Sequence, residues 1–131
     1  MNSIPVGTRE ERRLLVTPDL SINFLGSEEA RVFGTPWMIA HMEWTSRNAI
    51  KPFLAENEDS VGTMVSVQHL AATPLGMSVR IQAEVVQVEE RRVRFRVEAW
   101  DEKEKIGEGT HERFVVDIAR FTTRLAAKRN S

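Results

Sequence analysis

Apolar and polar residues alternate over most of the chain, in stretches that short turns separate. Such alternation places every second side chain on one face of a β-strand. The strands we predict in this way cover 6–16, 61–70, 77–88, 93–100 and 106–118. The first of them is rich in charge, which fits a strand at a sheet edge or a lead-in segment before the sheet. In the third, the apolar positions shift by one at Val86, which predicts a β-bulge.

One segment has the pattern of a helix instead. Gly34-Thr35-Pro36 joins a flexible residue, a hydroxyl that can act as an N-cap and a proline suited to the first helical turn. Pro52 disfavours helical geometry at Lys51, so the helix is predicted to end at about Ile50. Since its first half is apolar almost all round, we expect other elements to surround it, with Trp37 and Trp44 in the core.

The order of these elements predicts an α+β fold. One or more strands, a buried helix and a four-strand meander pack most simply as a curved antiparallel sheet wrapped around one long central helix, which is the hotdog fold. Before the helix, 20–25 alternates, and 27–33 is predicted to be a short helix or a loop. We expect a single domain over 1–131, with a core from about 6 to 121 and a frayed, basic C-terminal tail. Because a small sheet has edges to protect, a homodimer is expected, with a dimer of dimers also open.

The composition of the chain limits the chemical groups that are available for catalysis. The chain has 131 residues, 18 basic and 19 acidic side chains, a net charge of −1 and no cysteine. Without cysteine there is no thiolate nucleophile, disulfide or iron–sulfur cluster, so carboxylates, imidazoles, hydroxyls and backbone amides remain. The near-neutral charge predicts no nucleic-acid partner, and no apolar run is long enough for a membrane helix. A cytoplasmic location is favoured, and no metal or other cofactor is required.

Glu43 is the first candidate for catalysis, because it lies within the apolar part of the predicted helix. A carboxylate in such surroundings loses hydration and normally has a partner. The alternative is that Glu43 lies on a polar stripe and forms a solvated pair with Arg47, four residues further along.

Imidazole is the natural partner for proton transfer near neutral pH. His69 alternates with apolar residues of its strand and is therefore expected to face the helix, although a core histidine bonded to a backbone carbonyl has the same pattern. His41, on the predicted helix, is a competing candidate for this proton-transfer role. His111 lies in a strand loosened by glycines and is expected to be exposed.

Other residues have both a structural and a functional interpretation. Thr35 can cap the helix or support an oxyanion at its N-terminus, and Gly62 can begin a strand or let a ligand approach the backbone. Arg113 can be solvated or can bind a carboxylate or phosphate. The cluster Arg91, Arg92, Arg94 and Arg96 is typical of a solvated face, yet in a groove it would hold phosphates.

Three separated motifs resemble one protein family. They are Met42-Glu43-Trp44, Val67-x-His69-x-Ala71-Ala72-Thr73-Pro74 and Ile106-Gly107-x-Gly109-Thr110-His111-Glu112-Arg113. In order and spacing they are similar to segments of the fluoroacetyl-CoA thioesterases of the hotdog fold, and the similarity runs from about Val6 to Phe121. The resemblance implies an acyl-CoA thioesterase with Thr35, Glu43 and His69 as its catalytic set. Gly62 and Arg113 are implied on the substrate side, and Phe33 is a further candidate for binding the substrate.

One position departs from the family's pattern. The phenylalanine gate of the fluoroacetyl-specific member matches Glu29 here, so the resemblance implies hydrolysis of a short acyl-CoA without implying fluoroacetyl specificity. Two other functions stay open, an enoyl-CoA hydratase or dehydratase and a non-catalytic acyl-CoA binding protein. In a continuous helix Thr35 and Glu43 would lie about 12 Å apart, so a later helix start, a substrate spanning both residues or a site shared across a dimer is needed.

Overall fold

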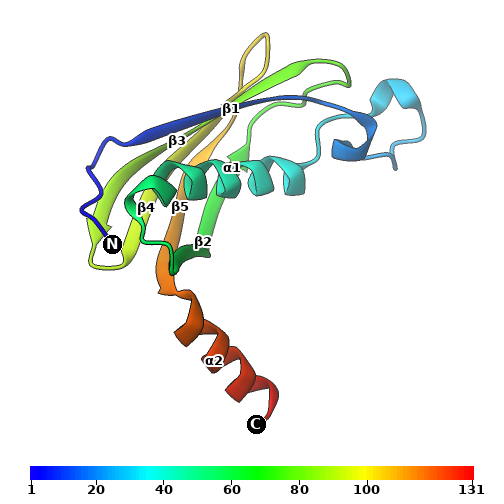
Figure 1. Ribbon diagram of the computed structural model, residues 1–131. Coiled ribbons are helices and arrows are strands. Elements are labelled where there is room, and N and C mark those ends of the chain that lie inside the picture. The colour runs from blue at the N-terminus through cyan, green and yellow to red at the C-terminus, as the bar shows by residue number, and fades with distance from the viewer.

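A computed structural model describes residues 1–131 and contains one five-stranded antiparallel sheet (Figure 1). The strands are β1 (Arg9–Leu15), β2 (Glu58–His69), β3 (Ser78–Glu89), β4 (Arg92–Trp100) and β5 (Lys105–Asp117). Their order across the sheet is β1-β3-β4-β5-β2, so β1 and β2 form the two edges. The charged first strand is thus an edge strand, as predicted, and it pairs with β3.

The helix α1 (Thr35–Ile50) lies across one face of the sheet. Met38, Met42 and Ile50 are fully buried between α1 and the inward-facing residues of β3 and β4, such as Ile81 and Phe95. The predicted α+β hotdog fold, a curved antiparallel sheet with one long central helix, is confirmed.

The expectation that α1 is surrounded on all sides is wrong. The Trp37 side chain is 41% exposed and Trp44 is 48% exposed, because the sheet covers only one face of the helix and both residues lie on the opposite face. The two tryptophans therefore do not belong to the core.

The segment between β1 and α1 contains short 3-10 helices instead of a second strand. The helices η1 (Pro18–Leu20) and η2 (Glu28–Ala30) flank a mainly exposed stretch, and the alternation at 20–25 yields only an isolated bridge between Ser21 and Phe33. The Phe33 N–H donates to the Thr73 carbonyl at 2.8 Å. These contacts hold the segment beside the end of β2.

The strand register shifts in three places, one of them between Ala99 and Trp100 of β4. The bulge predicted in β3 is confirmed by a register shift between Val85 and Gln87. A second shift, between Gly62 and Met64 of β2, is absent from the alternation pattern that we used to predict the strand. Because a bulge changes which side chains share a face, it separates Gly62 from the residues that follow it.

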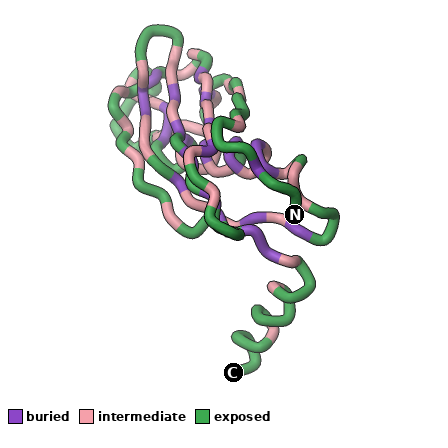
Figure 2. The backbone as a smooth tube through the Cα atoms, turned by 90° about the vertical axis from the view of Figure 1, so that its left-hand side faces the viewer, coloured by how far each residue is buried: buried purple, intermediate pink, exposed green.

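The C-terminal residues form a helix, α2 (Ile118–Arg129), where the sequence predicts a frayed tail. The Asp117 side chain caps it by accepting the Arg120 N–H at 3.0 Å, and Lys128 and Arg129 complement the dipole in its last turn. The helix extends away from the sheet, and none of its residues is buried (Figures 1 and 2). Before β2 a further 3-10 turn, η3 (Lys51–Phe53), extends the end of α1. No helix in the structure has the length and apolar character needed to span a bilayer.

Candidate functional site

The first residue of α1 and the last residue of β2 meet at one end of the sheet. The Thr35 hydroxyl lies 2.7 Å from Nδ1 of His69, within hydrogen-bonding distance. The Nε2 atom of His69 is buried and makes no hydrogen bond within the chain. Burial lowers the pKa of the His69 imidazole from its ordinary value of 6.5, so the ring is neutral at neutral pH. A neutral imidazole with one free nitrogen can accept a proton from a reacting group.

A cavity of about 340 Å³ adjoins this pair. Its lining is mostly apolar and consists of Ile22, Val32, Phe33, Thr35, His69, Leu70, Ala71 and Ala72. The buried ring of Phe33 meets the His69 imidazole edge-on, with 6.3 Å between the ring centroids. An apolar cavity with a few polar groups at one end is typical of a small-molecule site.

Thr35 is not the N-cap that its position predicts. The N-cap is Gly34, whose carbonyl accepts the N–H of Met38, and Thr35 is the first residue of the helix. The helix thus begins at Thr35 itself and not at a later residue. Because the Thr35 hydroxyl caps no N–H group, it is free to contact His69. The hydroxyl therefore lies at the positive end of the helix dipole, where it can support a developing negative charge.

Glu43 belongs to a second cluster, in the middle of α1. Its carboxylate approaches Gly62 of β2 so closely that a Cβ atom at position 62 would collide with Oε1. The same atom lies 3.7 Å from Nη1 of Arg113. With its side chain 38% exposed, Glu43 is less buried than the apolar sequence around it suggests. The carboxylate is thus held against a glycine and a cation, yet remains accessible.

Arg113 and His111 form the floor of this second cluster. Arg113 donates from Nε to the Ser60 hydroxyl at 2.7 Å and from Nη2 to the Ser60 carbonyl at 2.8 Å. His111 Nδ1 lies 2.8 Å from the Met64 carbonyl, so this nitrogen carries the proton and Nε2 is free to accept from Arg113 at 3.2 Å. The guanidinium is therefore fixed on three sides and turns Nη1 toward Glu43.

The expectation that His111 is exposed is wrong, since its residue is only 1% exposed. His111 alternates with Arg113 and Val115 on the inner face of β5, and that period of two was the signal that could have located it. Burial lowers the pKa of His111 from its ordinary value of 6.5, although the bond to the Met64 carbonyl opposes the shift.

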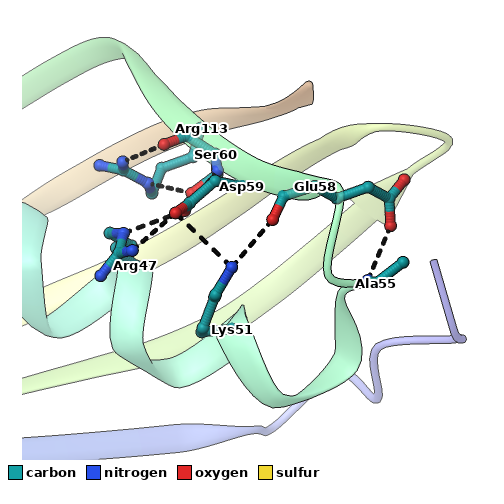
Figure 3. A network of polar contacts seen from close by, with 7 residues as sticks. All are labelled: Arg47, Lys51, Ala55, Glu58, Asp59, Ser60 and Arg113. Carbon is teal, nitrogen blue, oxygen red and sulfur yellow. Dashed lines mark hydrogen bonds and ion pairs between the residues drawn. The ribbon is translucent and has the colours of Figure 1, made fainter. Parts of the chain in front are cut away.

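Arg47 does not pair with Glu43, contrary to the alternative interpretation of the sequence. It binds Asp59 of β2 through two hydrogen bonds of 2.9 and 2.6 Å, and Lys51 donates to the Glu58 carbonyl at 2.9 Å (Figure 3). The Arg47 hydrogen bond lowers the pKa of the Asp59 carboxyl. This network ties the second half of α1 to the start of β2 and so positions Glu43 over Gly62.

The two clusters do not meet within one chain. Thr35 and Glu43 are eight residues apart on a continuous helix, which corresponds to about 12 Å. Gly62 and His69 are seven residues apart on β2, or about 20 Å. One cluster thus offers a neutral imidazole, a hydroxyl and a cavity, and the other offers a carboxylate beside a fixed cation.

Two remaining candidates lie outside both clusters. His41 is directed toward β1, where its Nδ1 lies 3.3 Å from Arg12, and burial followed by the Arg12 charge lowers its pKa. Glu29, the residue at the position of the gate, lies in η2, is exposed and does not line the cavity.

Comparison with known proteins gives consistent matches over nearly the whole chain. The profile of the family described as "Fluoroacetyl-CoA-specific thioesterase" matches residues 16–119. A curated fluoroacetyl-CoA thioesterase from Streptantibioticus cattleyicolor is 38% identical over 129 residues, covering 94% of this chain and 93% of that protein.

Solved structures agree with these matches. A thioesterase superfamily member from Thermus thermophilus has a TM-score of 0.90 at 33% identity, covering 99% of this chain and 96% of that one. A variant of the fluoroacetyl-CoA-specific thioesterase, in complex with fluoroacetate and CoA, has a TM-score of 0.81 at 39% identity, covering 89% of this chain and 98% of that one.

Proposed function

Because the chain belongs to the fluoroacetyl-CoA-specific thioesterase family and is a thioester hydrolase, we propose that it hydrolyses short acyl-CoA thioesters with Thr35, Glu43 and His69 as its catalytic residues. The observation that carries the proposal is the 2.7 Å contact between Thr35 and His69 beside an apolar cavity, with the second imidazole nitrogen buried and unpartnered. A cavity of about 340 Å³ walled by small residues and Phe33 suits a short acyl group.

Hydrolysis breaks the thioester C–S bond, consumes one water and releases a carboxylic acid and the CoA thiol. The Glu43 carboxylate either attacks the carbonyl carbon, forming an anhydride that water then opens, or takes a proton from the attacking water. His69 transfers protons through Nε2, the nitrogen that faces away from Thr35. The Thr35 hydroxyl and the Thr35 backbone N–H support the negative charge on the carbonyl oxygen, since Pro36 has no N–H and those of Trp37 and Met38 already donate to the Gly34 carbonyl. Arg113 orients Glu43.

A homodimer would bring the two clusters together. β2 is a twelve-residue edge strand whose outer side is unpaired in the chain, and Val65 within it and Leu70 directly after it are exposed. Two copies of β2 that pair antiparallel about a point between Val65 and Ser66 place Gly62 of each strand opposite His69 of the other. Each site would then combine Thr35 and His69 of one protomer with Glu43, Gly62 and Arg113 of its partner.

Purified enzyme is tested on acetyl-, fluoroacetyl-, propionyl- and benzoyl-CoA, with release of free thiol as the readout. Turnover of at least one short acyl-CoA that Glu43→Ala abolishes supports the proposal. Absence of turnover for every ester, or an unaffected Glu43→Ala variant, overturns it. Crotonyl-CoA hydration without thiol release would indicate a hydratase instead.

The shared site has its own test, in which two inactive variants are mixed. Glu43→Ala and His69→Ala chains are denatured together and refolded, so that mixed dimers form. If sites are shared, each mixed dimer has one site with both defects and one intact site, so random pairing restores about a quarter of wild-type activity. If each site lies within one chain, both sites of a mixed dimer carry one defect, and no activity returns.

A further inference from the structure

A second cavity, of about 480 Å³, lies where β5 continues into α2, at the opposite end of β2 from the Thr35–His69 pair. Three arginines line it, Arg91 from the turn between β3 and β4 and Arg120 and Arg124 from α2. The sequence singled out an arginine cluster at 91–96, and the mechanism proposed above uses none of it.

The arginines of that cluster and of the cavity differ in whether they are already paired with a carboxylate. Arg94 and Arg96 are neutralised by Glu112 and Glu84, each at 2.9 Å, on the outer face of the sheet. Arg91 binds Glu58 at 3.0 Å, but it also lines the cavity. The Arg120 and Arg124 guanidiniums make neither a hydrogen bond nor an ion pair within the chain, and Arg124 is placed only over the Phe121 ring. The cavity therefore has two guanidiniums without an ion-pair partner, beside the single carboxylate of Asp117.

The rest of the lining is compatible with an anion. Asp117 is the only carboxylate there, and both of its oxygens are engaged, Oδ1 with the Arg120 N–H at 3.0 Å and Oδ2 with Asn57 at 2.8 Å. The Phe114 ring, 37% exposed, adds a flat apolar surface on which a planar base can stack. Guanidiniums match the geometry of phosphate oxygens, and an aromatic face beside them suits a nucleotide.

The cavity also lies at a suitable distance from the proposed site. Gly62 pairs with Arg113 and Glu58 pairs with Asp117, so Asp117, the N-cap of α2, is four residues, or about 13 Å, along β5 from Arg113 of the Glu43 cluster. An extended pantetheine arm can span such a distance. We propose that Arg120 and Arg124, with Arg91, bind the phosphate groups of the CoA nucleotide while the thioester lies at Glu43. This inference rests on the proposed thioesterase function and names where the substrate's charged end is held.

The test compares one acyl group on two carriers, CoA and pantetheine, which lacks the nucleotide. For Arg120→Ala and Arg124→Ala we expect KM for the acyl-CoA to rise about tenfold each, the usual effect of losing a charge-assisted hydrogen bond. The rise should fall on KM and not on kcat, and KM for the acyl-pantetheine should stay within about twofold of wild type, since only the nucleotide contact is lost. Arg129→Ala, in the same helix but outside the cavity, is the matched control.

Calorimetric titration with adenosine 3′,5′-bisphosphate provides a readout that needs no turnover. Binding to the wild type that the Arg120→Ala/Arg124→Ala double variant loses supports the site. Equal KM changes for both carriers, unchanged KM values, or bisphosphate binding that the double variant retains would overturn it. If the wild type cleaves neither ester, the proposed function fails, and the titration still decides the phosphate site.

Discussion

The two clusters of candidate residues differ in how firmly the fold holds them. Thr35 and His69 are joined by one contact at the end of an edge strand, beside a cavity. Glu43 instead faces an arginine that Ser60 and His111 fix on three sides. The first cluster is therefore suited to moving a proton, and the second to holding a charge in place. Substitutions in the first should change activity alone, whereas those in the floor of the second should also change stability.

The largest effect is expected at Glu43. Its carboxylate is 38% exposed and supports little of the core, so Glu43→Gln should leave the free energy of unfolding nearly unchanged. The kcat/KM for a short acyl-CoA should fall by at least about a thousandfold, because the amide can neither attack a carbonyl nor accept a proton. Steady-state thiol release measures the loss. Glu56→Gln, an exposed carboxylate in the loop before β2, is the control, and a loss of equal size there would contradict the assignment.

A somewhat smaller loss is expected in the first cluster. His69→Gln should lower kcat/KM about a hundredfold, the usual contribution of a general acid or base. Thr35→Val should have a similar or smaller effect, and Thr35→Ser should restore most of the activity because it keeps the hydroxyl. Thermal unfolding should be almost unaffected in all three. A Thr35→Val enzyme with full activity would show that the contact with His69 is only structural.

Gly62→Ala tests how the second cluster positions its carboxylate. The new Cβ would collide with Glu43 and lie 3.2 Å from Cε1 of His111, so one of these side chains must move. A displacement of about 1 Å at a reacting group can cost up to a hundredfold in rate, and we expect a loss of about ten- to a hundredfold in kcat. Thr63→Ala on the same strand is the control. An unchanged kcat for Gly62→Ala would indicate that the close approach of Glu43 has no role in catalysis.

His111→Leu should distinguish the clusters by stability. The substitution leaves the Met64 carbonyl and one Arg113 N–H without partners in a buried setting, which costs about 2 kcal/mol. Urea denaturation of the variant and of the wild type measures the difference. His69→Leu is the matched control, since its ring lies beside a cavity. Equal losses in the two variants would contradict the distinction between them.

The smallest effect is a dependence of stability on pH. Burial lowers the pKa of His41, His69 and His111 from the ordinary value of 6.5, which the unfolded chain keeps. Below pH 6.5 the unfolded chain therefore binds more protons than the folded one. As the pH is lowered, the free energy of unfolding decreases until the histidines of the folded chain are also protonated. We expect the wild type to be less stable at about pH 5.5 than at pH 7.5, and His111→Gln to reduce this difference. A flat profile would contradict the burial of these rings.

Much of the fold follows from local pattern, because the information is local. The start of α1 at Gly34-Thr35-Pro36, its end before Pro52 and the bulge in β3 can all be predicted from residue types a few positions apart. The residue patterns also assign Glu43 to the helix and His69 to a strand. What they leave open is which residues meet, because Thr35 and His69 are 34 positions apart and only the folded chain brings them together.

The errors at the two tryptophans and at His111 arise because burial depends on neighbours that are far away in sequence. Trp37 and Trp44 are apolar but face away from the sheet, and His111 is polar but faces inward beside Arg113. The bulge at Gly62 shifts the alternation of side chains along β2. Val61 and His69 therefore do not lie on the same face of the sheet, although simple alternation would place them there. For α2, the cap at Asp117 and the basic last turn are local signals of a helix that the prediction of a frayed tail overlooked.

The projection of α2 away from the sheet has a consequence for how the molecule moves. A helix of twelve residues that buries none of them has only its cap and its backbone to oppose fraying. Its amide hydrogens should therefore exchange with solvent many times faster than those of β4, whose inward side chains are fully buried. Removing residues after 117 should leave the cooperative unfolding of the sheet nearly intact. The order of the C-terminal helix and the stability of the enzyme body are thus two separate equilibria in one short chain.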